Sequence, residues 1–243
     1  MTIIITMKQV TLKNLGTIPY KDAWDIQEEL LKSAISKKVN SNKSEEVENT
    51  LLICQHPHVY TLGKSGHSEN LLFRQEELEE NGIEFYVTNR GGDITYHGPG
   101  QLVAYPILDL EKFGSSIHLY LRNLEEVVIQ TLFEYGIQGE RLKGYTGVWI
   151  EPETSRARKI CAIGVRCSRW VTIHGLAFNV NTDLSYFKNI VPCGITDKGV
   201  TSINIELNRK VEESQLNEVF IQKFKEVFNV QITKAQTLST ALE

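Results

Sequence analysis

The sequence predicts a protein of the α/β (α+β) class, with a mixed β-sheet covered by helices. Amphipathic helical segments alternate with short apolar runs of strand character. Several of these strands follow one another directly, which favours a mixed sheet over a doubly wound parallel one. The 243 residues are enough for one substantial core. We therefore expect a single domain spanning residues 1–243, with the region after Thr201 as an alternative smaller lobe.

Apolar residues at helical spacing predict three long helices and one short one. Ser115-Ser116 provide an N-cap for one of them, and Gly136 ends it. The expected helices cover about residues 20–37, 74–80, 117–135 and 215–228. The expected strands cover about residues 50–55, 83–88, 101–108, 147–150, 160–166 and 170–179. The last two strands form a hairpin that turns near Cys167 to Arg169, and residues 38–49 form a polar surface loop.

The composition argues against a nucleic-acid-binding, membrane-spanning or secreted protein. Hydrophobic residues make up 41% and charged residues 23% of the chain, as in ordinary soluble proteins. A net charge of −4 disfavours a general nucleic-acid surface, and no run approaches the ~20 apolar residues of a membrane span. The N-terminus lacks the features of a secretory signal, and the four cysteines lack the spacing of a disulfide framework. We therefore expect a cytoplasmic protein that binds neither nucleic acid nor membrane.

The densest polar segment is the glycine-rich run RGGDITYHGPGQ, from Arg90 to Gln101. Four glycines and a proline in twelve residues bring backbone amides close to whatever binds there. The segment matches neither the P-loop nor the dinucleotide-binding fingerprint. The alternative interpretation is a tight hairpin loop that carries surface polar residues.

Two further segments carry groups capable of acyl chemistry. Cys193 lies between Pro192 and Gly194, in a turn that can expose a thiol. A lysine in the same pocket could convert that thiol into the attacking thiolate. Upstream, RKICAIGV begins with Arg158-Lys159, and strict alternation would place Lys159, Cys161 and Ile163 on one face of a strand. The alternatives are an inert Cys193 and a Lys159 that merely extends to solvent.

The remaining cysteines and histidines suggest no other centre. Cys54, Cys161 and Cys167 lie in apolar runs and are interpreted as small hydrophobes. Cys54, His56 and His58 alternate, but they lack the paired spacing of a zinc site, so we expect no metal. The serine-hydrolase motif GxSxG is absent.

Taken together, these segments resemble the lipoyl(octanoyl) transferases of lipoate biosynthesis, the LipB family. The matching pieces are HP with VYTLG from His56, RGGDITYHGPGQLVAYPI from Arg90, RKICAIGVR from Arg158, HGLAFN from His174 and IVPCGI from Ile190. They occur in the family's order and span about residues 51–202. The resemblance implies a fold like the catalytic domain of biotin and lipoate protein ligases. It also implies transfer of an octanoyl group from acyl carrier protein to a lysine of a lipoyl domain.

The resemblance assigns roles to particular residues. The family's nucleophile falls on Cys193 and its activating lysine on Lys159. A thioester donor is already activated, so no ATP or other cofactor is implied. The implied acceptors are the lipoyl domains of 2-oxoacid dehydrogenase E2 subunits and the glycine cleavage H protein. The segments of the acyl pocket fall on Arg90, Gly91, Gly92, Asp93, Ile94, Thr95, Tyr96 and His97, on Ala162, Ile163 and Gly164, and on Gly175, Leu176 and Ala177.

Several questions stay open at this stage. Lys159 could act as an ammonium that lowers the pKa of the thiol, or as a free amine that takes a proton from the incoming lysine. His97 could donate to the acyl carbonyl or hold the loop. Two other functions fit the same fold, namely an ATP-dependent lipoate–protein ligase and a non-catalytic acyl-binding module. Neither of them needs Cys193.

Overall fold

The computed structural model describes residues 7–39, 47–191 and 198–235. Its main sheet has eight strands in the order β10-β8-β9-β6-β2-β1-β11, with β7 also paired to β8. Strand β1 runs parallel to β2 and β11, whereas β2, β6, β9 and β8 form an antiparallel series. The strands are β1 (Lys8–Thr17), β2 (Thr50–Gln55), β6 (Gln101–Ile107), β7 (Val148–Ile150), β8 (Arg158–Ser168), β9 (Val171–Asn179), β10 (Gly199–Val200) and β11 (Val230–Lys234).

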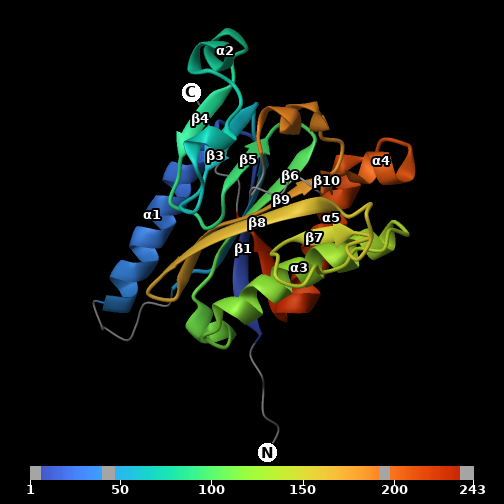
Figure 1. Ribbon diagram of the computed structural model, residues 1–243. Coiled ribbons are helices and arrows are strands. Elements are labelled where there is room, and N and C mark those ends of the chain that lie inside the picture. The colour runs from blue at the N-terminus through green and yellow to red at the C-terminus, as the bar shows by residue number, and fades with distance from the viewer. Residues whose placement is uncertain (1–6, 40–46, 192–197, 236–243) are drawn as a thin grey trace, which may run out of the picture.

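A second, three-stranded sheet lies beside one end of the first (Figure 1). Its order is β4-β3-β5, with β3 at Val59–Leu62, β4 at Glu84–Val87 and β5 at Ile94–His97. The short helix α2 (Gln75–Glu80) caps this sheet at the edge of the molecule. Leu78 from that helix, Ile94 and Tyr96 belong to a small separate core under the second sheet.

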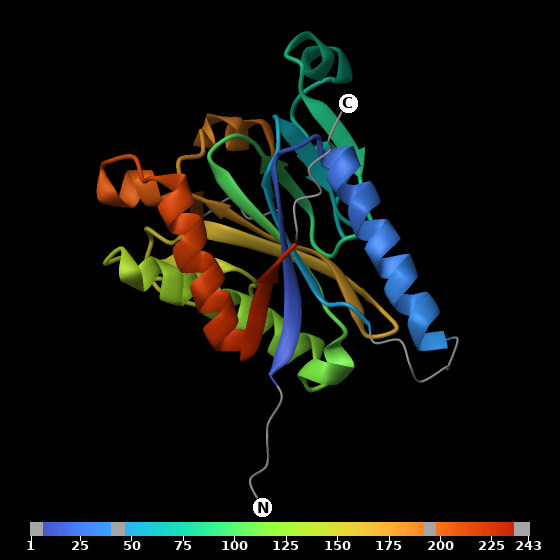
Figure 2. The ribbon, with the colours of Figure 1, turned by 180° about the vertical axis from the view of Figure 1, so that it is seen from behind.

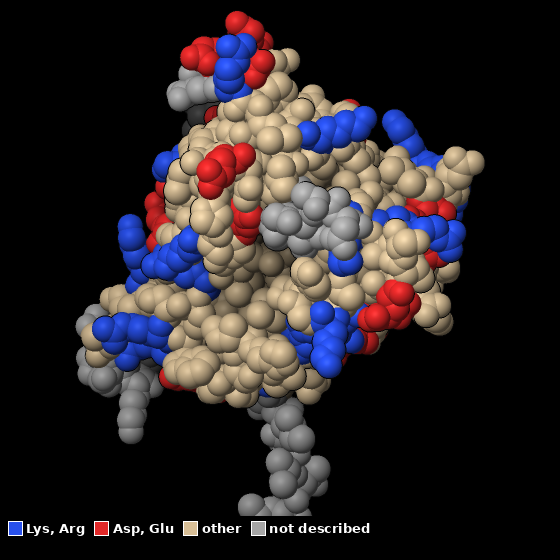
Figure 3. All heavy atoms as spheres, viewed as in Figure 1, with Lys and Arg blue, Asp and Glu red and all other residues tan. Residues whose placement is uncertain are grey.

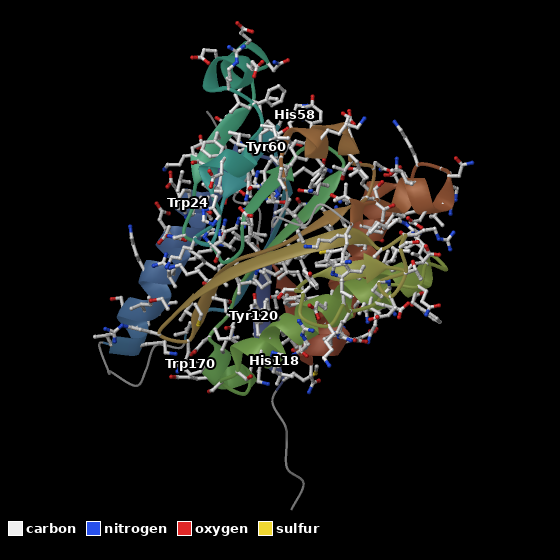
Figure 4. All side chains as sticks on the ribbon, in the orientation of Figure 1. Trp24, His58, Tyr60, His118, Tyr120 and Trp170 are labelled. Atoms are coloured by element: carbon white, nitrogen blue, oxygen red, sulfur yellow. The ribbon has the colours of Figure 1, made fainter. Side chains whose placement is uncertain are left out.

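Helices cover both faces of the main sheet. Helix α1 (Tyr20–Val39) lies on one face, and α3 (Ile117–Glu134) and α5 (Glu213–Phe228) pack together on the other (Figures 1 and 2). Figure 4 places Trp24 of α1 and Tyr120 of α3 on these opposite sides. Shorter elements are α4 (Ile203–Leu207) and 3₁₀ turns at Ser68–Asn70, Leu110–Phe113 and Leu184–Asn189. Within the described ranges, no helix combines the length and apolarity needed to cross a bilayer.

The cores explain why the predicted helices form. Leu124, Val128 and Leu132 of α3 recur at helical spacing and are fully buried against Phe220 and Phe224 of α5. Ser116 caps α3 through its hydroxyl, which accepts from the backbone N–H of Leu119 at 3.2 Å. The four predicted helices and the six predicted strands are all present, and their ends differ from the prediction by at most two residues. The prediction of a mixed sheet with packed helices is confirmed.

Five strands were not predicted: β1, β3, β5, the two-residue β10 and β11. Strands β1 and β11 contain only a few apolar residues, so their local signal is weak. They come from opposite ends of the chain and pair with each other, with Val10 opposite Ile232. After Thr201 the chain pairs with the main sheet through β11 and packs on α3 through α5. Most of the predicted polar loop at 38–49 lies outside the described residues.

The glycine-rich segment is not the tight hairpin considered above. Strand β5 pairs with β3 in the small sheet, whereas β6 pairs with β2 and β9 in the main sheet. The Gly98-Pro99-Gly100 turn therefore carries the chain from one sheet to the other. A side chain at Gly98 would collide with the Tyr96 hydroxyl, and Gly100 has a φ of +76°, so both positions require glycine.

Candidate active site

A cavity of about 480 Å³ lies where the two sheets meet α1 and the start of α3. Figure 3 shows the hollow on the face of Figure 1, with Lys and Arg side chains on either side of it. Its lining is mostly apolar or backbone, with a few convergent polar groups, as is usual for a ligand site. The cavity is lined by Tyr20, residues 90–95, His97, Gln101, Tyr105, Ile117, Leu121, residues 144–146, Lys159, residues 162–165, residues 174–177, Asn179, Phe187 and Val200.

The buried Arg90 side chain holds the glycine-rich loop against the small sheet. Its guanidinium donates to the carbonyl of Thr61 at 2.6 Å, to the Thr61 hydroxyl at 3.0 Å and to the carbonyl of Gly91 at 3.1 Å. The backbone N–H of Gly91 in turn donates to the carbonyl of Val165 at 3.0 Å. Arg90 therefore fixes the loop along the part of β8 that neither β7 nor β10 covers.

Two glycines let the walls of the cavity approach each other closely. A Cβ at Gly164 would lie 2.7 Å from the carbonyl oxygen of Gly91, across the gap between β8 and the loop. A Cβ at Gly175 would lie 2.0 Å from the carbonyl oxygen of Ala104, on the neighbouring strand β6. Both separations are shorter than van der Waals contact allows, so these walls exist only with glycine.

Hydrogen bonds fix the tautomer of His97. Gln101 uses its amide nitrogen to donate to Asn179 at 2.9 Å, so its oxygen is left to accept. His97 Nδ1 lies 2.8 Å from that oxygen and must therefore carry the proton. The Nε2 atom of His97 is the acceptor, 3.5 Å from the Thr61 hydroxyl. These hydrogen bonds tie His97 to Gln101 and Thr61 in the framework of the loop.

Two more buried imidazoles lie beside it. His56 donates from Nδ1 to the carbonyl of Ile18 and accepts from the Tyr105 hydroxyl, both at 2.8 Å. His174 bonds Asn89 through Nε2 at 2.7 Å, and its backbone has a φ of +59°, which is unusual for a non-glycine residue. Burial lowers the pKa of His97 and His174 to about 3 and that of His56 to about 4, so all three are neutral at pH 7.

These low pKa values predict acid sensitivity. Between pH 6.5 and about 3 the unfolded chain binds a proton at His97 that the folded chain does not, so stability falls as pH drops below about 6.5. We expect His97→Gln to flatten this dependence by up to about 1.4 kcal/mol per pH unit for one site. Thermal unfolding from pH 5 to 8 measures it, with His118→Gln on the exposed side of α3 as the control (Figure 4). Equal slopes for His97→Gln and wild type would contradict the prediction.

Lys159 reaches the cavity because β8 contains a bulge. Trp149 of β7 pairs with Lys159 and Val148 pairs with Cys161, so Ile160 is an extra residue on β8. Ile160 and Cys161 consequently both lie in the core under α3 and α5. The strict alternation predicted from sequence, with Lys159 and Cys161 on one face, is therefore wrong. The bulge turns Lys159 to the opposite side from Cys161.

The described members of the predicted pocket come together, with one exception. Residues from the three predicted segments and Lys159 line the same cavity, although they are up to 87 positions apart in the chain, from Arg90 to Ala177. Tyr96 does not line it, because its side chain points to the other face of β5 and stacks on Tyr186 at 4.9 Å between ring centroids. Cys193 and its turn lie outside the described residues.

Sequence reasoning missed several lining residues. Tyr20, Tyr105, Ile117, Leu121 and Tyr145 come from helices, a strand and a loop that showed only core or surface patterns. Tyr20 and Tyr105 are buried aromatic residues whose hydroxyl pKa is raised, mainly by burial. Their partners His56 and His97 were the available signal, since buried imidazoles need hydrogen-bonding or stacking neighbours.

The other thiols behave as predicted. Cys54 and Cys161 are buried in two hydrophobic clusters, and burial raises the pKa of both thiols. Cys167 packs partly buried against the core under α3. The described parts of the chain contain no cluster of three acidic, histidine or cysteine side chains suited to a metal ion.

Comparison with known proteins shows to which family this chain belongs. Residues 19–225 match the family described as the lipoyl protein ligase A/B catalytic domain. An octanoyltransferase of Christiangramia forsetii is 54% identical over 230 residues, covering 93% of this chain and 98% of the relative. An octanoyltransferase of Flavobacterium johnsoniae is 54% identical over 93% of this chain and 99% of the relative. One of Cytophaga hutchinsonii is 51% identical over 93% of this chain and 96% of the relative. The chain belongs to the octanoyltransferase family. The expected family and the enzyme class, an acyltransferase, are confirmed.

Solved structures agree on the fold. A bipartite lipoate protein ligase of Thermoplasma acidophilum superposes with a TM-score of 0.69 at 17% identity, over 94% of this chain and 87% of the ligase. A lipoate–protein ligase A bound with ATP superposes with a TM-score of 0.67 at 15% identity, over 95% and 89%. The expected ligase-like fold is therefore confirmed. At these identities the likeness concerns the fold alone.

Proposed function

We propose that this protein transfers an octanoyl group from the thioester of acyl carrier protein to the ε-amine of a lysine on lipoyl domains. The acceptors are the lipoyl domains of 2-oxoacid dehydrogenase E2 subunits and the glycine cleavage H protein. The observation that supports this most is the cavity, which joins Lys159 to a largely apolar channel along β8 in a chain 54% identical to octanoyltransferases. An eight-carbon chain gains about 0.8 kcal/mol per buried methylene in such a channel.

The proposed first step acylates the enzyme. The thiolate of Cys193 attacks the octanoyl carbonyl, a new C–S bond forms, and the C–S bond to the carrier's thiol breaks. The leaving thiolate takes a proton from the Lys159 ammonium, which becomes a free amine. Before this step the positive charge on Lys159 favours the Cys193 thiolate. Both roles of Lys159 left open by the sequence are thus used, in succession.

The proposed second step passes the acyl group on. The acceptor lysine enters as an ammonium, loses one proton to the Lys159 amine and attacks the thioester carbon. As the C–N bond forms, the bond to Cys193 breaks and the nitrogen releases its second proton to solvent. The cycle leaves an amide on the acceptor, a thiolate at Cys193 and an ammonium at Lys159.

Neutral histidines suit an acyl channel. Because His97 and His174 carry no charge at pH 7, they add no positive charge to the wall, and the Arg90 guanidinium is directed to Thr61 and Gly91. A chain of methylenes therefore meets few groups that would have to give up hydration. We assign Arg90, His97, Gly164 and Gly175 to shaping the channel.

The function is tested by mixing the purified chain with octanoyl-acyl carrier protein and an apo lipoyl domain, with and without ATP. We expect the intact mass of the lipoyl domain to rise by one octanoyl group, independently of ATP. A requirement for free octanoate or lipoate together with ATP would instead establish a ligase. Binding of the acyl carrier with no transfer to any lipoyl domain would establish a binding module.

We also propose that the protein works in the cytoplasm. Cys54, Cys161 and Cys167 are all free thiols in the structure, which suits a reducing compartment. Antibody detection after cell fractionation tests this assignment, and recovery of the protein with an extracytoplasmic fraction would contradict it.

A further inference from the structure

Lys159 faces the indole of Trp149. The two residues are directly paired across β7 and β8, so their side chains lie on the same face of the sheet. The Lys159 Nζ atom lies 4.7 Å from the centroid of the Trp149 ring, over its face. An ammonium at this distance is attracted by the negative face of the aromatic system, whereas a neutral amine gains almost nothing.

The indole is buried and packs against a second aromatic ring. Trp149 is 1% exposed, and Tyr145 packs edge-on against it, with 5.9 Å between ring centroids and 67° between planes. Tyr145 also lines the cavity beside Lys159. The indole is therefore almost completely enclosed, with the Tyr145 ring beside it and Lys159 over its face.

A hydrogen bond from the indole N–H does not explain why tryptophan occupies position 149. Its indole N–H is buried and has no hydrogen-bond partner, which is unfavourable for a donor removed from water. Phenylalanine would fill much of the same space without an unsatisfied donor. What tryptophan offers beyond phenylalanine is a larger face with more negative potential, and that property acts on a cation.

We propose that Trp149 is a positioning residue that holds Lys159 over the cavity in its ammonium form. This proposal rests on the proposed function for the role of Lys159 in catalysis. Trp149 then keeps Lys159 protonated up to a higher pH, so that an ammonium is available when the leaving thiolate forms. The contact is restored when the proton returns from the acceptor lysine.

Other ionisable groups around Lys159 must be considered in any pH experiment. Charges nearby on β8 and α3 are already paired, because Arg158 bonds Glu206 and Glu151, and Glu125 bonds two arginines. The buried Cys161 thiol lies within electrostatic reach of Lys159, but burial raises its pKa. Described ionisable side chains on β8 and on the elements next to Lys159 include Arg122, Glu125, Glu140, Arg141, Lys143, Tyr145, Glu151, Arg158, Cys161, Lys198 and Glu206. The proposed mechanism adds the thiol of Cys193.

The test measures the proton affinity of Lys159 directly. Trace labelling with acetic anhydride from pH 7 to 11, followed by peptide mass spectrometry, yields the pKa of each lysine in the folded full-length protein. We expect Trp149→Leu to lower the pKa of Lys159 by roughly half a unit to one and a half units. Trp149→Phe, which keeps a weaker aromatic face, should give a smaller decrease and restore part of the wild-type value.

Two controls separate this effect from general disturbance. Trp170→Leu makes the same chemical change at the tip of the β8–β9 hairpin, well away from α5 and β7 (Figure 4), and should leave the pKa of Lys159 unchanged. Exposed Lys32 in each digest should label identically in all variants. If Trp149→Leu does not fold, Trp149→Phe decides alone.

The outcomes distinguish this proposal from the proposed function. An unchanged Lys159 pKa in folded Trp149→Phe and Trp149→Leu overturns the role of Trp149, whatever the transfer assay shows. A lowered pKa supports that role even if no octanoyl transfer is observed, in which case the proposed function fails and the contact stands. With transfer present, the alkaline limb of its pH–rate profile should move to lower pH in the same variants.

Discussion

Replacing Cys193 with serine is expected to reduce octanoyl transfer by at least about 1,000-fold, because a serine hydroxyl is hardly ionised at neutral pH. The wild-type chain, incubated with octanoyl-acyl carrier protein alone, should gain the mass of one octanoyl group. Cys193→Ser should gain none. Lys159→Ala should keep the thiol but raise the pH at which Cys193 reacts with an alkylating agent.

The matched control for this experiment is Cys167→Ser. Cys167 lies near the tip of the β8–β9 hairpin and does not line the cavity, so its loss should leave both the acyl-enzyme and the transfer rate close to wild type. Full transfer by Cys193→Ser would refute the covalent mechanism. Loss of the acyl-enzyme with retained transfer would instead show direct attack of the acceptor amine on the carrier thioester.

The largest effect expected on stability comes from Gly175→Ala. The new Cβ would lie 2.0 Å from the carbonyl oxygen of Ala104 and 2.9 Å from Pro106 Cδ. Both atoms belong to β6, so relief requires β9 and β6 to separate in the middle of the main sheet. We expect a loss of roughly 3 kcal/mol in the free energy of unfolding. That loss corresponds to a decrease in melting temperature of about 6–12 °C for a chain of this size.

Gly199→Ala is the control for that substitution. Gly199 is also in a strand, but a Cβ there would meet its nearest atom, Arg158 Cβ, at 3.5 Å, which is ordinary contact. Its effect on the free energy of unfolding should stay within about 0.5 kcal/mol. Melting curves of both variants decide the matter. Equal melting temperatures for Gly175→Ala and wild type would show that β6 and β9 can yield at this point.

Helices were predictable because their signal is local. The helical spacing of Leu124, Val128 and Leu132 predicts a buried face on α3 whatever element packs against it. Ser116 predicts where that helix begins. Strand β11 has no comparable signal. Its place is decided by pairing with β1, more than 200 residues earlier in the chain, and no local pattern encodes a partner at that distance.

The cavity illustrates the same division. The segments at Arg90, Lys159 and Gly175 were identified from their composition and from a family resemblance. Tyr20, Leu121 and Tyr145 could not be identified, because each shows the pattern of an ordinary core or loop residue. They line the cavity only because α1, α3 and the loop before β7 converge there. Tyr96 was predicted to line the cavity but does not. Side chains alternate along β5, so Thr95 and His97 face the cavity and Tyr96 faces away from it.

The sequence by itself determined the family, the fold class, the helices and the three segments that line the cavity, because motifs and periodicity are properties of neighbouring residues. The tertiary structure decided which way Lys159 points. Strict alternation would have buried Lys159 on the same face as Cys161. The pairing of β7 with β8 shows one extra residue, Ile160, and Lys159 therefore lies on the opposite face, over Trp149. A bulge is defined by two strands together, so its effect on a side chain cannot be deduced from one strand alone.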